Sequence, residues 1–128
     1  MVTTLYAGIL GLIYVALSLY VIKGRFQYRV SLGSGGSEDL EKRIRAHANF
    51  IEYVPFALIL IFLCELEKMP ELMVHFMASL LVMARLLHAN ALCGNIVAIP
   101  NGRQIGMVGT FTVLIISAVY CIKSFFIF

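Results

Sequence analysis

The sequence predicts an all-α membrane protein, a bundle of four transmembrane helices. Hydrophobic residues make up 61% of the 128-residue chain and charged residues only 13%, whereas a soluble domain carries roughly a quarter charged residues. The mean hydropathy is +0.93. Four apolar stretches, each long enough to cross a bilayer at roughly 20 residues, use almost the whole chain. The length allows a single domain.

Turn and loop signals separate the four spans. A Gly/Ser-rich loop follows the first span, and a short acidic turn leads to Pro70, which suits the first turn of the third helix. Pro100-Asn101-Gly102 marks a turn before the last span. Ser37 is expected to cap the second helix. The expected helices cover residues 5–22, 38–64, 70–93 and 104–127.

An alternative for the second and third spans is a re-entrant pair, since each contains ionisable residues. Full crossings fit better, because the apolar stretches are long and the connections between them are short.

Basic residues near the span ends predict the orientation in the membrane, because cytoplasmic connections carry the excess of Lys and Arg. Those at the first and third connections are Lys23, Arg25, Arg29, Lys42, Arg43, Arg45 and Arg103. The opposite side has only Lys68 and Lys123. We therefore expect the first and third connections in the cytoplasm and both chain ends on the far side.

Several other classes of site find little support in the sequence. No basic tract is interleaved with aromatic residues, so nucleic acid is not an expected partner. The three histidines lack zinc-ligand spacing, so no metal is expected. Cys64, Cys93 and Cys121 lie too far apart in the chain for a metal or redox motif. We expect them to be inert buried thiols.

Polar side chains gather on one stripe of the second span. The members of this polar stripe, spaced i, i+4, i+7 and i+8, are Arg45, Asn49, Glu52 and Tyr53. Together they offer donors and acceptors to a zwitterionic ligand, with Arg45 binding a carboxylate and Glu52 an ammonium group. The structural alternative is that Glu52 pairs with Arg85 of the third span, because buried charges are usually paired.

A second polar pair, Arg43 and His47, lies on roughly the opposite face of the same span. A helix with two polar faces at one depth cannot show either of them to lipid. We therefore expect this helix to pack against its own bundle on one side and against another subunit on the other.

Three further residues are candidates for a site. Arg103, after the Pro-Asn-Gly turn, has the charge to stabilise a bound thiolate. Arg25 ends the first span in a similar way, and for both arginines the alternative is an ordinary membrane anchor. His88 could line a pocket as a donor or acceptor, and its alternative is a structural role.

The second span also resembles the signature of the MAPEG family, membrane-associated proteins in eicosanoid and glutathione metabolism. The matching pattern is Arg-Ala-x-x-Asn-x-x-Glu-x-x-Pro, from Arg45 to Pro55. The segment 84–89, Ala-Arg-Leu-Leu-His-Ala, resembles the third-helix motif of small bacterial members. Span number, length and the long first connection extend the resemblance to the whole chain.

The resemblance implies a left-handed four-helix bundle, assembled as a homotrimer in a bacterial inner membrane. Glutathione would bind between subunits near the cytoplasmic side. The polar stripe would hold it from one subunit, and Arg25 and His47 would reach it from the neighbour. His88, a candidate for the wall of the same pocket, is not part of what the resemblance implies. Arg103 would be the catalytic residue that stabilises the glutathione thiolate.

Three functions follow as hypotheses. The first is a glutathione-dependent transferase or peroxidase acting on a lipophilic electrophile from the bilayer. The alternative is a non-catalytic lipid-binding or scaffold protein on the same trimeric fold, because enzymatic relatives carry tyrosines late in the third helix where this chain has His88 and Leu92. A small-solute channel fits less well, because no polar stripe crosses a full membrane thickness.

Overall fold

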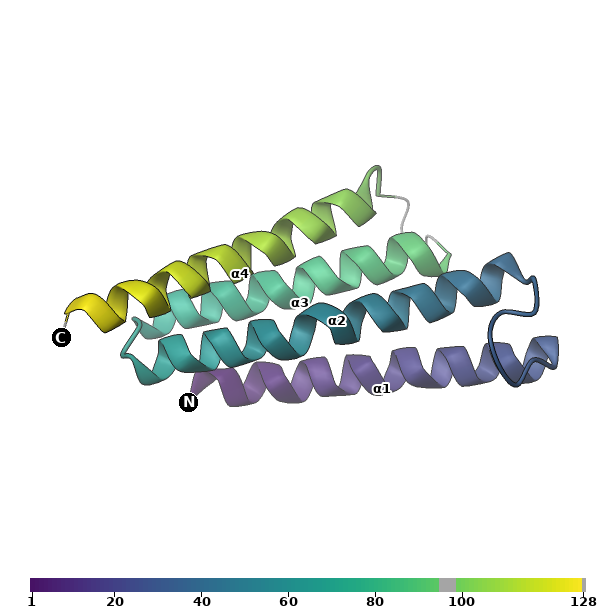
Figure 1. The fold of residues 1–128 in the computed structure, drawn as a ribbon, viewed down its shortest axis with the longest axis horizontal. Helices are drawn as coiled ribbons and strands as arrows, with labels where there is room; N and C mark the ends of the chain where they lie inside the picture. Colours follow the sequence, from purple (N-terminus) through teal and green to yellow (C-terminus); the bar gives the residue numbers. More distant parts are fainter. Residues whose placement is uncertain (95–98, 128) are drawn as a thin grey trace.

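The computed structural model describes residues 1–94 and 99–127 and consists of four long helices. They are α1 (Val2–Tyr28), α2 (Glu38–Leu66), α3 (Glu71–Cys93) and α4 (Gly102–Ile127). All four are long and apolar enough to cross a membrane. The expected all-α fold, a bundle of four transmembrane helices, is confirmed (Figure 1).

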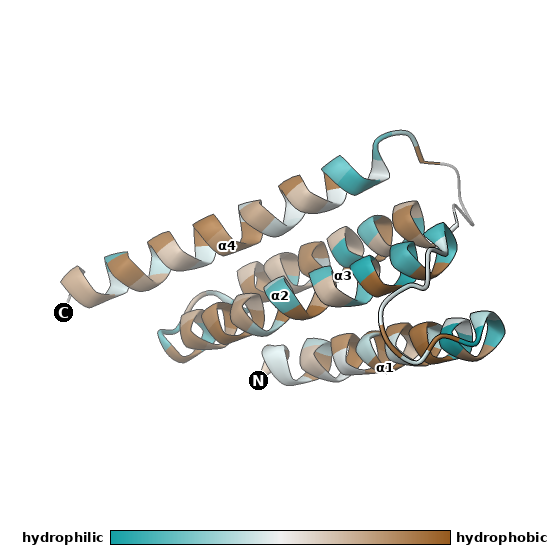
Figure 2. Ribbon diagram, turned by 45° about the vertical axis from the view of Figure 1, so that its right-hand side comes forward, coloured by the Kyte–Doolittle hydropathy of each residue, from teal (hydrophilic) through white to brown (hydrophobic). Residues whose placement is uncertain are grey.

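The helices run side by side, and both chain ends lie at the same end of the bundle as the turn between α2 and α3 (Figure 1). The α1–α2 and α3–α4 connections lie at the other end. α2 packs against all three other helices and α1 also contacts α3, whereas α1 and α4 do not touch within the described residues. Figure 2 shows the larger group of hydrophilic residues at the end that carries the α1–α2 and α3–α4 connections.

α1 is longer than the hydropathy predicts, because it continues past Ile22 to Tyr28. Lys23 is exposed, so its charge does not require the helix to end there. The helix ends at Arg29, which adopts a left-handed backbone conformation with φ of 52°. α2 also runs two residues further than expected and α4 begins two residues earlier, while Pro70 precedes α3 as its cap.

Side chains satisfy backbone groups at the ends of the first two helices. The Ser37 hydroxyl accepts a 3.2 Å hydrogen bond from the backbone N–H of Leu40, which confirms the expected cap of α2. At the other end of α2, the Glu65 carboxylate accepts hydrogen bonds from the backbone N–H groups of Val2 and Thr3. This carboxylate therefore caps α1 from a neighbouring helix.

The buried core follows the contact of α2 with α3, where Val54, Ile61 and Leu81 have almost no exposed surface. The outward faces of α1 and α4 carry large exposed apolar side chains such as Leu12 and Ile115. Lipid, rather than water, is the solvent that suits such faces.

Glycines bring α4 unusually close to α3. A Cβ added to Gly106 would lie 2.5 Å from the carbonyl oxygen of Ala84 and 2.9 Å from the Cβ of His88, and one at Gly109 would lie 3.0 Å from the Cβ of Ala84. Only residues without a side chain allow such an approach, which is common between transmembrane helices. This contact sets the position of the first turns of α4, including Arg103.

Candidate functional site

The polar stripe lies in the first half of α2, toward the end of the bundle where hydrophilic residues gather. Arg45 and Glu52 are exposed on the surface of the chain, whereas Asn49 and Tyr53 are half-buried. Within the described residues, no ion pair involves Arg45 or Glu52. The stripe therefore has an inner edge within the bundle and an outer, charged edge.

A buried arginine holds the inner edge of the stripe. Arg85 of α3 is only 1% exposed. Its Nη1 donates a 2.7 Å hydrogen bond to Oδ1 of Asn49, and its Nη2 donates a 3.1 Å hydrogen bond to the carbonyl oxygen of Gly106. One guanidinium thus joins α3 to both α2 and α4. Hydrogen bonds from a charged donor are among the stronger ones.

The alternative that Glu52 pairs with Arg85 is wrong. Glu52 is rotated by about 60° around the helix from Asn49, which takes it from the bundle side to the exposed side. The amide oxygen of Asn49 occupies the place beside Arg85 instead. The charge of Glu52 is consequently left on the outer face of α2.

Tyr53 is held by aromatic contacts on the same inner edge. Its ring meets that of Phe111 in α4 edge-on, with centroids 5.6 Å apart and an interplanar angle of 87°. The Cζ of Arg85 lies 5.8 Å from the Tyr53 ring centroid, within the range of a cation–π contact. Asn49 is therefore positioned by α3, and Tyr53 by both α3 and α4.

The second polar face of α2 packs against α1. Arg43 lies over the Tyr20 ring, 4.1 Å from its centroid, and forms a 2.7 Å ion pair with Asp39. Nε2 of His47 lies 3.0 Å from the Ser18 hydroxyl. Both side chains are thus engaged inside their own chain, on the side of α2 away from Arg45.

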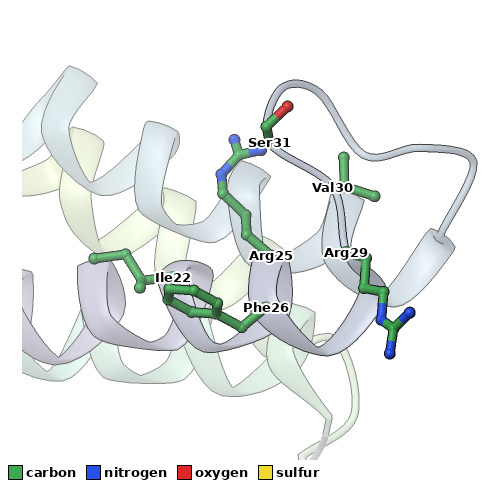
Figure 3. A pocket seen from close by; sticks show the side chains of 6 residues that line it. All are labelled: Ile22, Arg25, Phe26, Arg29, Val30 and Ser31. Carbon is green, nitrogen blue, oxygen red and sulfur yellow. The ribbon is translucent and has the colours of Figure 1, made fainter.

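Arg25 lies near the end of α1, where it lines a cavity that contains no residue of the polar stripe. Its Nη1 donates a 2.9 Å hydrogen bond to the carbonyl oxygen of Gly33, which ties α1 to the following loop. The cavity has a volume of about 490 Å³ and is lined by Ile22, Arg25, Phe26, Arg29, Val30 and Ser31. In Figure 3 the Arg25 side chain reaches toward Ser31, while the Arg29 side chain points away from Ser31. Within the described part of the chain, no hydrogen bond or ion pair joins Arg25 to the polar stripe.

His88 and Arg103 lie toward the end of the bundle that carries the polar stripe. His88 is buried, one turn after Arg85 and directly against Gly106. Arg103 is exposed in the first turn of α4, three residues before the Gly106 carbonyl that accepts from Arg85. The first turns of α4 are therefore linked to the stripe through Arg85, although no direct hydrogen bond between Arg103 and the stripe is formed within the described residues.

Sequence reasoning missed that Arg85 organises the stripe. The available signal was small residues facing each other, Ala84 in α3 and Gly106 in α4, which predict a close helix contact beside Arg85. Ser18, the partner of His47, gave no comparable signal. Among the described residues, no group of three or more His, Cys, Asp or Glu side chains is placed to hold a metal ion.

Four membrane-crossing helices with a polar cluster at one end define a small helical integral membrane protein. The chain belongs to the MAPEG family, whose model matches residues 3–123. It is 39% identical over 88 residues to the inner membrane protein YecN of Escherichia coli strain K12. The matched segment covers 69% of this chain and 67% of YecN. YecN of a second Escherichia coli strain matches with the same values, and no solved structure was found to match.

These comparisons confirm two expectations from the sequence. The family suggested by the α2 signature is the family of this chain. The chain is an integral protein of a bacterial inner membrane, in agreement with its four apolar helices and with the location in the name of its relative.

Proposed function

We propose that this protein is a glutathione-dependent transferase or peroxidase that acts on a lipophilic electrophile. The observation that carries the proposal is the pair of opposite charges, Arg45 and Glu52, on the outer face of α2. Charges in a membrane segment need partners. Glutathione offers a partner of each sign, because its carboxylates suit Arg45 and its ammonium group suits Glu52.

The inner edge of the stripe would add neutral hydrogen bonds to this ligand. Because Oδ1 of Asn49 accepts from Arg85, its amide N–H groups would face outward as donors. The Tyr53 hydroxyl can donate or accept. Both side chains are already fixed by neighbouring helices, so little further ordering would accompany binding.

Glutathione would supply the nucleophilic sulfur of the reaction. Arg103 would stabilise that sulfur in its thiolate form, as a fixed positive charge beside it. The close packing at Gly106 supports this role, because it holds the first turns of α4 in one position. The electrophile would arrive from the bilayer along the apolar outer faces of the helices.

We also infer a homotrimer, in which a neighbouring subunit covers the outer face of α2. This arrangement would remove Arg45 and Glu52 from lipid. The neighbour would contribute Arg25 and His47 to the ligand. Since Nε2 of His47 is engaged by Ser18, His47 would use its other ring nitrogen.

Turnover of an aryl halide or a lipid hydroperoxide by the purified protein tests the proposed catalytic role. The Arg103→Ala variant should lose about 100-fold or more in rate, the usual loss when one stabilising group is removed. Lys123→Ala, at the far end of α4, is the matched control and should retain the wild-type rate. Full activity in an Arg103→Ala protein of unchanged oligomeric state would remove Arg103 from the mechanism.

A second candidate function is a non-catalytic lipid-binding or scaffold protein. The cavity at the end of α1 favours it, because Arg25 lines this cavity together with the apolar Ile22 and Phe26. Such a combination suits an anionic headgroup with its acyl chain. Under this alternative, Glu52→Gln would weaken assembly more than ligand affinity. A stable trimer of this variant without glutathione binding would count against the scaffold role.

A further inference from the structure

Two of the three cysteines lie side by side at the end of the bundle away from the polar stripe. The sulfur atoms of Cys64 in α2 and Cys121 in α4 are 3.5 Å apart, although 57 positions separate the two residues in the chain. Cys93 ends α3 at the opposite end of the bundle. The two thiols are thus placed so that a small approach would bring them within bonding distance.

The two thiols differ in their access to reagents. Cys64 is fully buried and donates a 3.4 Å hydrogen bond to the carbonyl oxygen of Ser117. Cys121 is half-buried and lines a cavity of about 830 Å³, whose wall includes the charged residues Glu67 and Lys68. A cavity with charged walls beside the α2–α3 turn is accessible from water, so a water-soluble reagent can reach Cys121 first.

Neighbouring hydrogen bonds hold the two helices in register around the thiol pair. The Ser124 hydroxyl donates a 2.7 Å hydrogen bond to the Glu67 carboxylate, and the Tyr120 hydroxyl donates to the Glu67 carbonyl oxygen. The segment that follows Cys64 is thereby fastened on both sides of Cys121. This arrangement favours bond formation between these two sulfurs over reaction with a thiol elsewhere.

We propose that Cys64 and Cys121 are a thiol-oxidation site, at which a reversible disulfide joins α2 to α4. The oxidant is a low-molecular-weight disulfide. The Cys121 thiolate attacks one of its sulfurs and releases one thiol, which gives a mixed disulfide at Cys121. The Cys64 thiolate then attacks the Cys121 sulfur and releases the second thiol. The two cysteines lose two electrons and two protons, and the oxidant takes up both to become two thiols.

The location of the pair supports this inference independently of the proposed glutathione chemistry. In the orientation expected from the basic residues, this end of the bundle lies outside the cytoplasm, where disulfides persist. α4 contacts only α2 and α3 within the described residues. A covalent link to α2 would therefore restrain α4 at the end opposite Arg103.

Mass spectrometry of the purified protein in detergent tests the proposal. The protein is treated with hydroxyethyl disulfide, denatured, alkylated and digested, with or without a reductant. We expect a Cys64–Cys121 linked peptide pair in the wild type and in the control Cys93→Ser, and its loss on reduction. The linked form should also melt at a higher temperature than the reduced form.

Two single variants distinguish the order of the steps. In Cys64→Ser, Cys121 should stop at the mixed disulfide with the reagent, whereas in Cys121→Ser the buried Cys64 should remain a free thiol. The wild-type result does not depend on how these variants fold. Two alkylated thiols at Cys64 and Cys121 of the oxidised wild type, or a link that involves Cys93 instead, would overturn the proposal.

Discussion

The guanidinium of Arg85 donates a 2.7 Å hydrogen bond to the side-chain oxygen of Asn49, and this bond connects the buried cation of α3 to the polar stripe of α2. The same guanidinium donates to the carbonyl oxygen of Gly106 in α4. Three helices therefore meet at one side chain. The placement of Asn49 and Tyr53 depends on it, as does the path from the stripe to Arg103.

Removing the Asn49 side chain should destabilise the protein. Asn49→Ala leaves the buried Arg85 without one of its acceptors, and a lost hydrogen bond to a charged group costs about 1.5–3 kcal/mol of unfolding free energy. Thermal unfolding in detergent, followed by circular dichroism, measures the effect. Lys42→Ala, a change of an exposed side chain on the same helix, should shift the unfolding free energy by less than about 0.5 kcal/mol. Equal stability of Asn49→Ala and the wild type would show that this bond is not needed.

Adding one methyl group at the α3–α4 contact should also be costly. The new Cβ in Gly106→Ala would meet the Ala84 carbonyl oxygen at 2.5 Å, so the helices must separate, at a cost of about 1–3 kcal/mol. Gly8→Ala, which meets nothing within 4 Å, should be neutral or stabilising by up to about 1 kcal/mol. The same unfolding assay compares the two. If both changes had the same effect, the close approach of α4 to α3 would be in doubt.

The orientation can be tested by thiol labelling in intact cells. In a background with all three cysteines replaced by alanine, we expect Glu71→Cys to react with a membrane-impermeant reagent. Leu32→Cys, in the loop after α1, should react only after lysis, because the excess of basic residues places that loop in the cytoplasm. Both positions are exposed in the chain. The reverse pattern of labelling would contradict the orientation.

The proposed assembly predicts three chains in a detergent-solubilised particle. Native mass spectrometry should give a protein mass three times the 14.3 kDa of one chain. The reason is the outer face of α2, where Arg45 and Glu52 need a cover other than lipid. A particle that contained one or two chains would exclude the trimer and leave the source of that cover open.

The helices and their order could be predicted from the sequence because hydropathy and turn residues act locally. The composition required lipid, and Ser37 marked the start of α2 correctly. The end of α1 was placed six residues too early, because hydropathy detects the apolar segment and not the helix, which continues through Lys23 and Arg25 as far as Tyr28.

Contacts between distant segments were not predictable in the same way. Charge alone suggested Glu52 as the partner of Arg85, but the rotation of α2 within the bundle selects Asn49. The contact of Cys64 with Cys121 depends on how α2 and α4 are aligned lengthwise, which no local pattern encodes. The grouping of Arg25 and His47 with the stripe of a neighbouring subunit stays a prediction, because it concerns an interface between chains.

Glutathione binding by titration calorimetry tests the central claim most directly. The purified protein in detergent is compared with Arg45→Ala, which removes a charge from the polar stripe, and with Lys42→Ala, which removes an exposed charge outside the stripe. We expect saturable binding to the wild type and to Lys42→Ala, and its loss in Arg45→Ala. Absence of binding to the wild type at millimolar glutathione would contradict a glutathione site on α2.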